Sequence, residues 1–492
     1  MSPRARLRGA TRRPGLALLA SIRLIPLALA ALAIPAAAAP KHKPAATVAY
    51  VTKAGDTLYA IAARYLTDPR GWAVLSRLNH VPAPRRLQAG IELRLPLALL
   101  KQEPLSASVA ALSGPVEHAF GAGPYTPLSI DSILGEGDRV RTGHSGFVTL
   151  ELADGTHLSL PQDSSIELAT LRQTTLTGTT DREINLRRGE VDSEVTHAKK
   201  PDDRFQIHSP SVVAGVRGTR FRVNYDLAGQ VSAVEVLEGT VDVDAADATT
   251  TSDSAVEGAL QTPSEQRVHA HFGSVTRAQG EVGAPVELLP APALIHPEKI
   301  QDEAEVGFDL APLDQATAQT ATQTATQTAT QAPAQTQAYR VQIARDAGLL
   351  DLVRETHVGA PHASFGDLPD GTYFVRISAI DNQGLEGLSR IYAFERRQFG
   401  LAATAGPSAA GRAYEFRWLA GQRGIETHFR FVLASTPDLS NPIVDQVDIT
   451  AAKVLVSDLP RGVYYWTVIG EQFDQGKLYQ KAGAVRSFTL DY

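Results

Sequence analysis

Ser145 is the residue of this 492-residue chain that comes closest to a catalytic nucleophile. It lies in GHSGF, which differs from the G-x-S-x-G turn of serine hydrolases because the second glycine comes one residue too early. The neighbouring residues alternate as in a β hairpin, whereas the hydrolase serine needs a strand-to-helix turn. We therefore expect a turn residue at Ser145 and no catalytic residue in the chain.

Two histidines and three acidic residues have side chains of the types that bind metal ions. His269 and His271 flank a single alanine, so on one strand they would share a face, as a pair of metal ligands does. No further histidine or carboxylate follows them at a matching interval. Asp131, Glu136 and Asp138 lack the ligand spacing of a calcium loop. We expect no metal site and no cofactor.

The composition excludes further classes of function. The chain has no cysteine, which rules out disulfides, thiolate metal sites, a cysteine nucleophile and the lipidated cysteine of a bacterial lipoprotein. Its net charge of −6 provides no basic field for nucleic acid, so no nucleic-acid partner is expected. A hydrophobic content of 43% over this length is sufficient for three or four packed domains.

Residues 1–39 have the organisation of an export signal peptide. Several arginines precede an apolar run over residues 16–33, and small residues follow before Pro40. An uncleaved anchor is the alternative, although Arg23 and Pro26 interrupt the apolar run. No later stretch approaches the roughly 20 apolar residues of a membrane helix. We predict export to the periplasm or cell envelope, with no membrane span after signal removal.

The pattern of residues 47–97 predicts a small βααβ module. One strand begins at Val48, and another ends at Leu95 after alternating apolar and polar residues. Between them, apolar residues recur at helical spacing in two short stretches. We expect Asp56 to be the N-cap of the first helix, and Asp68, which precedes a proline, to be the N-cap of the second.

This module resembles the LysM family of glycan-binding modules in YVTKAGDTLYAIAARYL, the RLN step and LQAGIELRLP. The resemblance implies binding of polymers that contain N-acetylglucosamine, peptidoglycan in bacteria, in a shallow groove between two loops. Loop backbone can supply the donor and acceptor for the acetamido group, and an apolar patch can receive its methyl. Transferred to this sequence, the groove residues are Gly55, Asp56, Thr57 and Leu58 on one loop and Leu78, Asn79, His80 and Val81 on the other.

Three of these residues also have a structural interpretation. Asp56 could act only as a helix cap, Leu58 could belong to the core, and Asn79 could simply end the second helix. The sequence leaves both interpretations open for each of them.

Residues 107–280 carry repeated β-hairpin signals. In RFRVNYD, apolar Phe221 and Val223 alternate with Arg222 and its polar neighbours, which predicts one buried face. Asp154 and the following glycine fit a type I′ turn, and RRGEV predicts a strand-turn-strand around Gly189. We expect EQRVHAHFGSV to be a closing strand after a disordered polar loop over residues 245–264.

The motifs GDRVRTG, FVTLELADGTHLSL, RRGEV, FQIHSPSVVAGVRGTRFRV and VEVLEGTVDV together resemble a FecR-type domain. That family consists of extracytoplasmic β-rich modules, and the resemblance implies a β-rich fold for residues 107–280. Members of the family occur in regulators that pass a signal from the outer membrane to a cytoplasmic sigma factor.

The C-terminal part of the chain contains two copies of one unit, 91 residues apart. Leu368, Gly371 and Tyr373 in the first copy correspond to Leu459, Gly462 and Tyr464 in the second. The short alternating strands resemble immunoglobulin-like or fibronectin type III-like sandwiches, at residues 285–397 and 398–492. The Ala/Thr/Gln tract at 316–337 is expected to be a disordered loop inserted in the first sandwich.

The sequence thus predicts a multidomain, mostly β protein with a small βααβ LysM-like module, a β-rich FecR-like domain and two β-sandwich repeats. The predicted function is non-catalytic: the LysM-like module binds peptidoglycan glycan strands, and the other domains form a scaffold or sensor surface for a second envelope protein. One alternative is a FecR-type signalling regulator, for which only the N-terminal run could span the membrane. The other is an envelope hydrolase, since LysM modules often accompany wall-cleaving enzymes.

Overall fold

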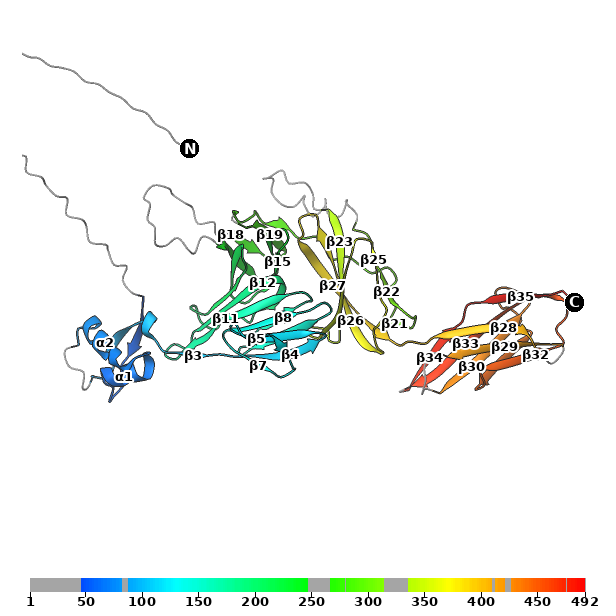
Figure 1. Ribbon diagram of the computed structural model, residues 1–492, viewed down its shortest axis with the longest axis horizontal. Coiled ribbons are helices and arrows are strands. Elements are labelled where there is room, and N and C mark those ends of the chain that lie inside the picture. The colour runs from blue at the N-terminus through cyan, green and yellow to red at the C-terminus, as the bar shows by residue number, and fades with distance from the viewer. Residues whose placement is uncertain are drawn as a thin grey trace, which may run out of the picture.

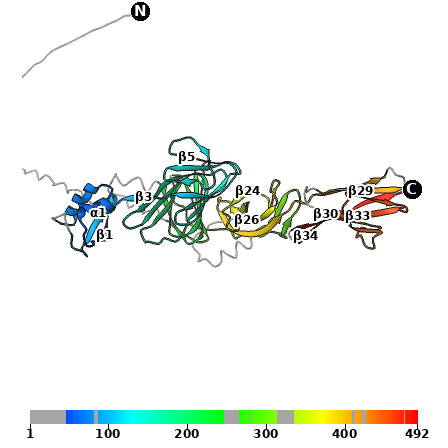
Figure 2. The same cartoon turned by 90° about the horizontal axis from the view of Figure 1, so that it is seen from below.

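The computed structural model describes residues 46–81, 87–246, 266–278, 280–313, 335–408, 412–420, 426–474 and 476–491. The described parts form an elongated row, with the two-helix module at one end and the second sandwich at the other (Figures 1 and 2). The expected signal peptide at 1–39 lies outside the described residues, as do most of the expected loops at 245–264 and 316–337. None of the helices in the described ranges is long and apolar enough to cross a membrane.

The N-terminal module has the predicted βααβ order. Its elements are β1 (Thr47–Val51), α1 (Leu58–Tyr65), the 3-10 helix η1 (Pro69–Gly71), α2 (Trp72–Leu78) and β2 (Glu92–Pro96). Strands β1 and β2 pair antiparallel, and the helices pack on them through fully buried side chains such as Leu58, Ile61 and Leu75. The second helical stretch begins as predicted, with Asp68 Oδ1 accepting a hydrogen bond of 2.8 Å from Arg70 N.

Residues 97–104 hold the N-terminal module against the central β domain. They form the 3-10 helix η2 (Leu97–Leu99) and strand β3 (Gln102–Pro104), which pairs with strand β11 (Ser165–Thr174). Lys101 N donates a hydrogen bond of 2.7 Å to Tyr65 O, and Leu176 packs against the apolar core of the N-terminal module. The two units therefore share backbone pairing and apolar contact.

The central β domain consists of a closed succession of strands around one large apolar core. With β3 and β11, its strands are β4 (Ala107–Ser113), β5 (Val116–Phe120), β6 (Thr126–Pro127), β7 (Ile133–Leu134), β8 (Asp138–Thr142), β9 (Phe147–Leu152), β10 (His157–Leu160), β12 (Thr180–Glu194), β13 (Arg204–His208), β14 (Val212–Val216), β15 (Arg220–Asp226), β16 (Val231–Glu238), β17 (Thr240–Ala245), β18 (Gln266–His269), β19 (Phe272–Arg277) and β20 (Val286–Glu287). The predicted inward residues Phe221 and Val223 are fully buried in this core.

Strand β12 corrects the expectation of a strand-turn-strand around Gly189. The strand runs unbroken through 15 residues; its first half pairs with β11 and β13, and its second half pairs with β10 and β15. Gly189 lies at the bend with φ +76°, where an added Cβ would meet Ser164 Oγ at 2.5 Å. Glycine at this position allows one strand to pair with different neighbours along its two halves. Local sequence signals do not distinguish this role of glycine from its role in a turn.

The expected closing strand in EQRVHAHFGSV is interrupted in the middle. Its first part, β18, pairs antiparallel with β17, its second part, β19, pairs antiparallel with β16, and His271 lies in the break with φ +69°. His269 and His271 therefore do not share one strand face. No group of three or more metal-binding side chains occurs within the described part of the chain.

The first sandwich has a five-stranded sheet in the order β21-β27-β26-β23-β24, covered by the pair β22–β25. Its strands are β21 (Ile300–Gln301), β22 (Val306–Asp309), β23 (Thr336–Ala344), β24 (Leu352–Val358), β25 (His362–Phe365), β26 (Gly371–Asp381) and β27 (Glu386–Arg396). Val306 of β22 and Val341 of β23 are fully buried in the same core. The strands before and after the Ala/Thr/Gln tract therefore belong to one sandwich.

The second sandwich packs the sheet β28-β29-β32 against the sheet formed by β31, β30, β33, β34 and β35. Its strands are β28 (Leu401–Pro407), β29 (Ala413–Ala420), β30 (Thr427–Ala434), β31 (Val444–Ile449), β32 (Lys453–Ser457), β33 (Gly462–Asp474), β34 (Lys477–Ala482) and β35 (Arg486–Leu490). Tyr373 Oη donates to Pro369 O at 3.0 Å, and Tyr464 Oη donates to Pro460 O at 2.7 Å. The two copies thus share the tyrosine hydrogen bond typical of immunoglobulin-like sandwiches.

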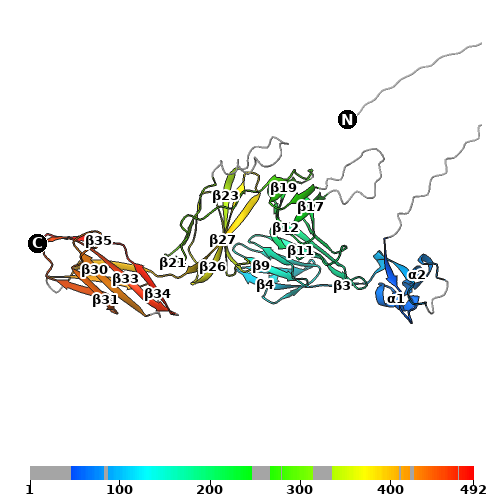
Figure 3. The ribbon, with the colours of Figure 1, turned by 180° about the vertical axis from the view of Figure 1, so that it is seen from behind.

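Charged side chains fill the interface between the central domain and the first sandwich, which lie against each other in Figure 3. The outward face of β12, β15 and β16 meets the outward face of β23, β24, β26 and β27. Seven of the eight charged residues have side chains that are at most 12% exposed. The eighth, Glu235, is 2% exposed as a whole residue. We call this set the interface charge cluster; its members are Arg222, Arg340, Arg376, Glu190, Asp192, Glu235, Glu355 and Glu386.

Glu386 and Arg340 lie at the centre of this cluster. Glu386 forms an ion pair with Arg222, and its Oε2 lies 2.6 Å from Arg340 Nη1. Arg340 also binds Glu190, with its Nη1 at 2.7 Å from Oε1, and Glu355, with its Nη2 at 2.8 Å from Oε2. Arg340 and Glu386 belong to the sandwich, whereas Arg222 and Glu190 belong to the central domain, so each unit neutralises charges of the other.

Burial shifts the pKa values of several carboxyl groups in this cluster. Burial raises the pKa of Glu235 to about 8, and burial also raises the pKa of Glu190 above its usual range. Burial opposes ionisation of Glu386 as well, but Arg222 and Arg340 lower its pKa well below the usual range.

We predict that alkaline pH destabilises this interface through Glu235. Because its pKa is higher in the folded protein than in the unfolded chain, the stabilising contribution is complete at acidic pH and is lost as the pH rises through about 8. Between pH 7 and 9.5 the free energy of unfolding should fall by about 1 kcal/mol. The measurement is thermal unfolding of the full chain as a function of pH.

Glu235→Gln, which imitates the protonated acid, should flatten this pH dependence. Glu238→Gln on the same strand is the control, because Glu238 is exposed. An unchanged pH dependence in Glu235→Gln would show that Glu235 is already ionised at neutral pH.

Candidate glycan-binding site

The first loop of the predicted groove is fixed by its own side chains. Asp56 Oδ2 accepts hydrogen bonds from Lys53 N at 2.7 Å and from Tyr50 Oη at 2.9 Å. Thr57, not Asp56, is the N-cap of α1, because Thr57 Oγ1 accepts from Ala60 N at 3.0 Å. The expectation that Asp56 caps the helix is therefore wrong: Asp56 closes the turn that precedes the cap.

The protonation of Tyr50 supports this turn. Burial and the hydrogen bond to Asp56 raise the pKa of Tyr50 to about 12. The phenol therefore stays protonated and donates to the carboxylate at any physiological pH. This contact holds the loop to strand β1.

The second loop is held by Asn79 at the end of α2. Asn79 Nδ2 donates to Leu75 O and to Arg94 O, both at 2.9 Å, and Asn79 Oδ1 accepts from Arg94 N at 2.6 Å. One side chain thus joins the helix end to strand β2. His80 follows with φ +55° and an exposed side chain, and Val81 N bonds to Ser76 O at 3.0 Å.

The eight predicted groove residues differ in their exposure to solvent. The side chain of Leu58 is fully buried in the core, and that of Asn79 is committed to structural bonds. Gly55, Leu78 and His80 are exposed, while Asp56, Thr57 and Val81 are half-buried. The surface available to a ligand therefore consists of loop backbone around Gly55, the Thr57 side chain and the edge formed by Leu78, His80 and Val81.

The core of the module brings these two loops together. Leu58 follows the first loop, Val81 ends the second, and both pack in the same apolar cluster with Leu87. Leu87 N also donates to Asp56 O at 3.0 Å, which joins the first loop to the chain that leaves the second loop. Uncharged donors, acceptors and aliphatic groups on this surface suit a neutral amino sugar better than an ion.

Sequence reasoning missed Tyr59 as a candidate contact. Its side chain is 57% exposed in the first turn of α1, directly after the first loop. The signal was present, since Tyr59 falls outside the apolar stripe of the helix. An exposed aromatic ring beside this candidate sugar-binding loop offers apolar surface with a polar end.

Two family models match this chain. Residues 50–96 match the model described as LysM domain, and residues 138–242 match the model described as FecR protein. The two resemblances seen in the sequence are thus confirmed for these segments, and neither model spans half of the chain. The chain matches no curated protein.

Solved structures with partial similarity include a protein assigned as an anti-sigma factor from Parabacteroides distasonis, at 19% identity and a TM-score of 0.22. The match covers 30% of this chain and 59% of that protein. Fibronectin(III)-like modules of CbhA from Clostridium thermocellum match at 10% identity and a TM-score of 0.18, over 40% of this chain and 90% of theirs. The three FN1–FN3 domains of chicken CNTN1 match at 12% identity and a TM-score of 0.22, over 53% of this chain and 98% of theirs.

Replacing Asn79 by alanine should loosen the second loop. The substitution removes the side-chain hydrogen bonds to the backbone of Arg94, at a cost of about 1 kcal/mol to the N-terminal module. Hydrogen exchange of the β2 amides should accelerate, while exchange in the two sandwiches stays as in the parent. Arg77→Ala, which changes an exposed residue of the same helix, is the control; equal effects of both substitutions would contradict this role.

Proposed function

We propose that this protein is a non-catalytic component of the bacterial cell envelope that binds peptidoglycan glycan strands through residues 50–96. The observation that carries the proposal is the match of this segment to the LysM family together with two loops fixed for ligand contact. The two matched families are non-catalytic. Export by a signal peptide at 1–39 and residence in the periplasm or envelope form part of the proposal.

Binding uses the loop surface described above. Backbone near Gly55 and the Thr57 hydroxyl pair with the acetamido group, and Leu78 with Val81 receives its methyl. Because both loops are held in place before the ligand arrives, little ordering entropy is lost on binding. A single shallow groove nevertheless gives modest affinity, so retention at the wall gains from several simultaneous contacts along a polymer.

The remaining domains form the surface that the anchored protein presents to an envelope partner. The central domain and first sandwich act as one unit through the interface charge cluster. The second sandwich continues the row, with Lys481 Nζ 2.9 Å from Asp302 Oδ1 of the first. Such a row holds the terminal sandwich at a set distance from the wall.

A signalling regulator is the second candidate, favoured by the match of residues 138–242 to the FecR family. This role needs a membrane segment, and the N-terminal apolar run is the candidate for it. N-terminal sequencing of the exported protein separates the two: a mature chain that begins near Pro40 favours the wall-bound scaffold, and a retained N-terminus favours the regulator.

Sedimentation with purified peptidoglycan tests the primary proposal. The exported protein should pellet with the polymer, and a chain without residues 48–96 should stay in the supernatant. Leu78→Glu, which puts a charge on the loop surface, should weaken binding about tenfold. Leu97→Glu is the matched control, because Leu97 is similarly exposed, at 44% against 38%, and lies outside both loops.

The result that would contradict the proposal is a parent chain that stays in solution while a known wall-binding protein sediments in the same tube. Muropeptides should not be released during this assay. Their release would favour the envelope hydrolase.

A further inference from the structure

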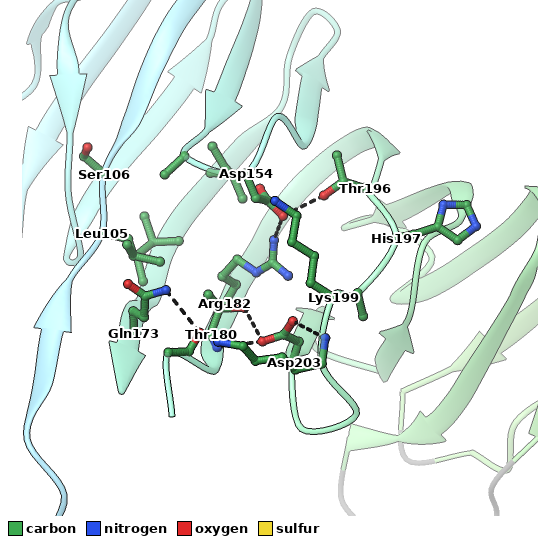
Figure 4. Close-up of a pocket in the computed structure, with 16 residues that line it drawn as sticks. Leu105, Ser106, Asp154, Gln173, Thr180, Arg182, Thr196, His197, Lys199 and Asp203 are labelled. Atoms are coloured by element: carbon green, nitrogen blue, oxygen red, sulfur yellow. Dashed lines mark hydrogen bonds and ion pairs between the residues drawn. The ribbon is translucent and has the colours of Figure 1, made fainter. Parts of the chain in front are cut away.

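A cavity of about 290 Å³ opens in the central domain close to its junction with the N-terminal module. Figure 4 shows the side chains that surround it. Aliphatic groups form one part of the lining, namely Leu105, Leu152, Ala153, Leu171 and Ala198. The residues that line the cavity include no phenylalanine, tyrosine or tryptophan, so the stacking surface typical of a sugar-ring site is missing.

A buried ion pair forms the floor of this cavity. Arg182, only 5% exposed, pairs through Nη1 with Asp154, and its guanidinium lies 5.5 Å from the centre of the Phe205 ring. Thr196 Oγ1 donates to Asp154 Oδ2 at 2.7 Å, which fixes the carboxylate. Arg182 Nε is buried and has no hydrogen-bond partner among the described residues. The floor is thus a rigid polar surface with a donor still unused.

Cations outnumber anions around the cavity. Lys199 is exposed at the rim, and Lys200 Nζ donates to Thr177 O at 2.6 Å. Asp203 is held by Thr180 N at 2.9 Å and by Lys200 N at 3.0 Å. The lining thus contains three cations, Arg182, Lys199 and Lys200, and two carboxylates, Asp154 and Asp203. The net charge of the whole protein is −6. This local surplus favours an anion.

We propose that this cavity binds the carboxylate end of a short peptide with small aliphatic side chains. The carboxylate pairs with Lys199 at the rim, and the methyl groups lie against Leu105, Leu152 and Ala198. The volume is sufficient for about two small residues.

The position of the cavity indicates a peptidoglycan peptide stem as the source of this carboxylate, a step that rests on the proposed function. Leu105 and Ser106 of the cavity follow directly after β3, which joins the N-terminal module to the central domain. A glycan strand held by the N-terminal module therefore lies next to the domain that carries the cavity.

Calorimetric titration of the purified protein with N-acetyl-D-alanyl-D-alanine tests the proposal. This probe contains no amino sugar, so its binding does not depend on the LysM-like groove. The C-terminal amide of the same dipeptide should bind about tenfold more weakly, because the charge-assisted contact is lost. N-acetyl-L-alanyl-L-alanine should also bind more weakly.

Two substitutions locate the binding. Lys199→Gln should weaken binding of the acid about tenfold and leave binding of the amide unchanged. Ala153→Phe, at an exposed position on the lining, should block both ligands by filling the cavity. Lys453→Gln, at an exposed lysine of the second sandwich, is the matched control and should bind as the parent does.

Equal affinity for acid and amide, or undiminished binding by Ala153→Phe, would overturn the carboxylate site. Tighter binding of the L-dipeptide would overturn the wall peptide as its source and favour a protein C-terminus. A chain that binds the dipeptide but fails to sediment with peptidoglycan would refute the proposed function and leave the cavity site standing.

Discussion

The burial of Arg340 between two units of the fold constrains the rest of this structure. An arginine that is 2% exposed is stable only if carboxylates surround it, because an unpaired buried charge costs several kcal/mol. Its partners come from both sides, Glu190 from the central domain and Glu355 and Glu386 from the sandwich. Separating the units would leave Glu190 and Arg222 without these partners. The charge cluster therefore fixes the relative orientation of the two units, since such pairs tolerate little change in geometry.

Apolar contacts on two sides of the cluster exclude water from it. On one side Phe147 packs with Leu349 and Leu352, and on the other Leu288 packs with Ala233 and Leu385. Water exclusion strengthens the ion pairs and raises the pKa of Glu235. The interface thus combines apolar edges with a charged centre. This arrangement contributes specificity of orientation more than net stability.

The other junctions of the chain extend this rigidity. Strand β3 pairs with β11 next to the N-terminal module, and Phe399 packs so closely on Gly470 that an added Cβ would meet its ring at 2.5 Å. Tyr479 Oη donates to Glu395 Oε1 at 2.9 Å at the same junction between the sandwiches. Under the proposed function, binding of the N-terminal module to the wall gives the far sandwich a defined reach into the envelope.

Local patterns were sufficient to predict much of the fold. The apolar stripe around Leu58 predicted the first helix, and the repeated Tyr373 and Tyr464 predicted two related sandwiches. The prediction of a turn at Gly189 was wrong, because a glycine within one long strand has the same local sequence signature as a glycine in a turn. The order of the strands within the closed sheet depends on pairing between distant segments, which alternation alone does not specify.

The charge cluster could not have been predicted in the same way. Alternation correctly places Arg222 on the outer face of β15, opposite the buried Phe221. On a single domain that face is exposed to water, and only the covering sandwich buries it. Likewise, the groove residues followed from a family resemblance, but the sequence could not tell that Leu58 is core or that Asn79 is tied to Arg94. These distinctions arise from tertiary contacts between distant segments.

Hydrogen exchange of the full chain with and without soluble peptidoglycan fragments tests the account most directly. Addition of glycan should slow exchange in the loops around Gly55 and His80. Amides of the second sandwich should exchange at the same rate with and without the ligand. If instead the sandwiches gain protection while both loops of the N-terminal module are unaffected, the assignment of wall binding to this module is contradicted.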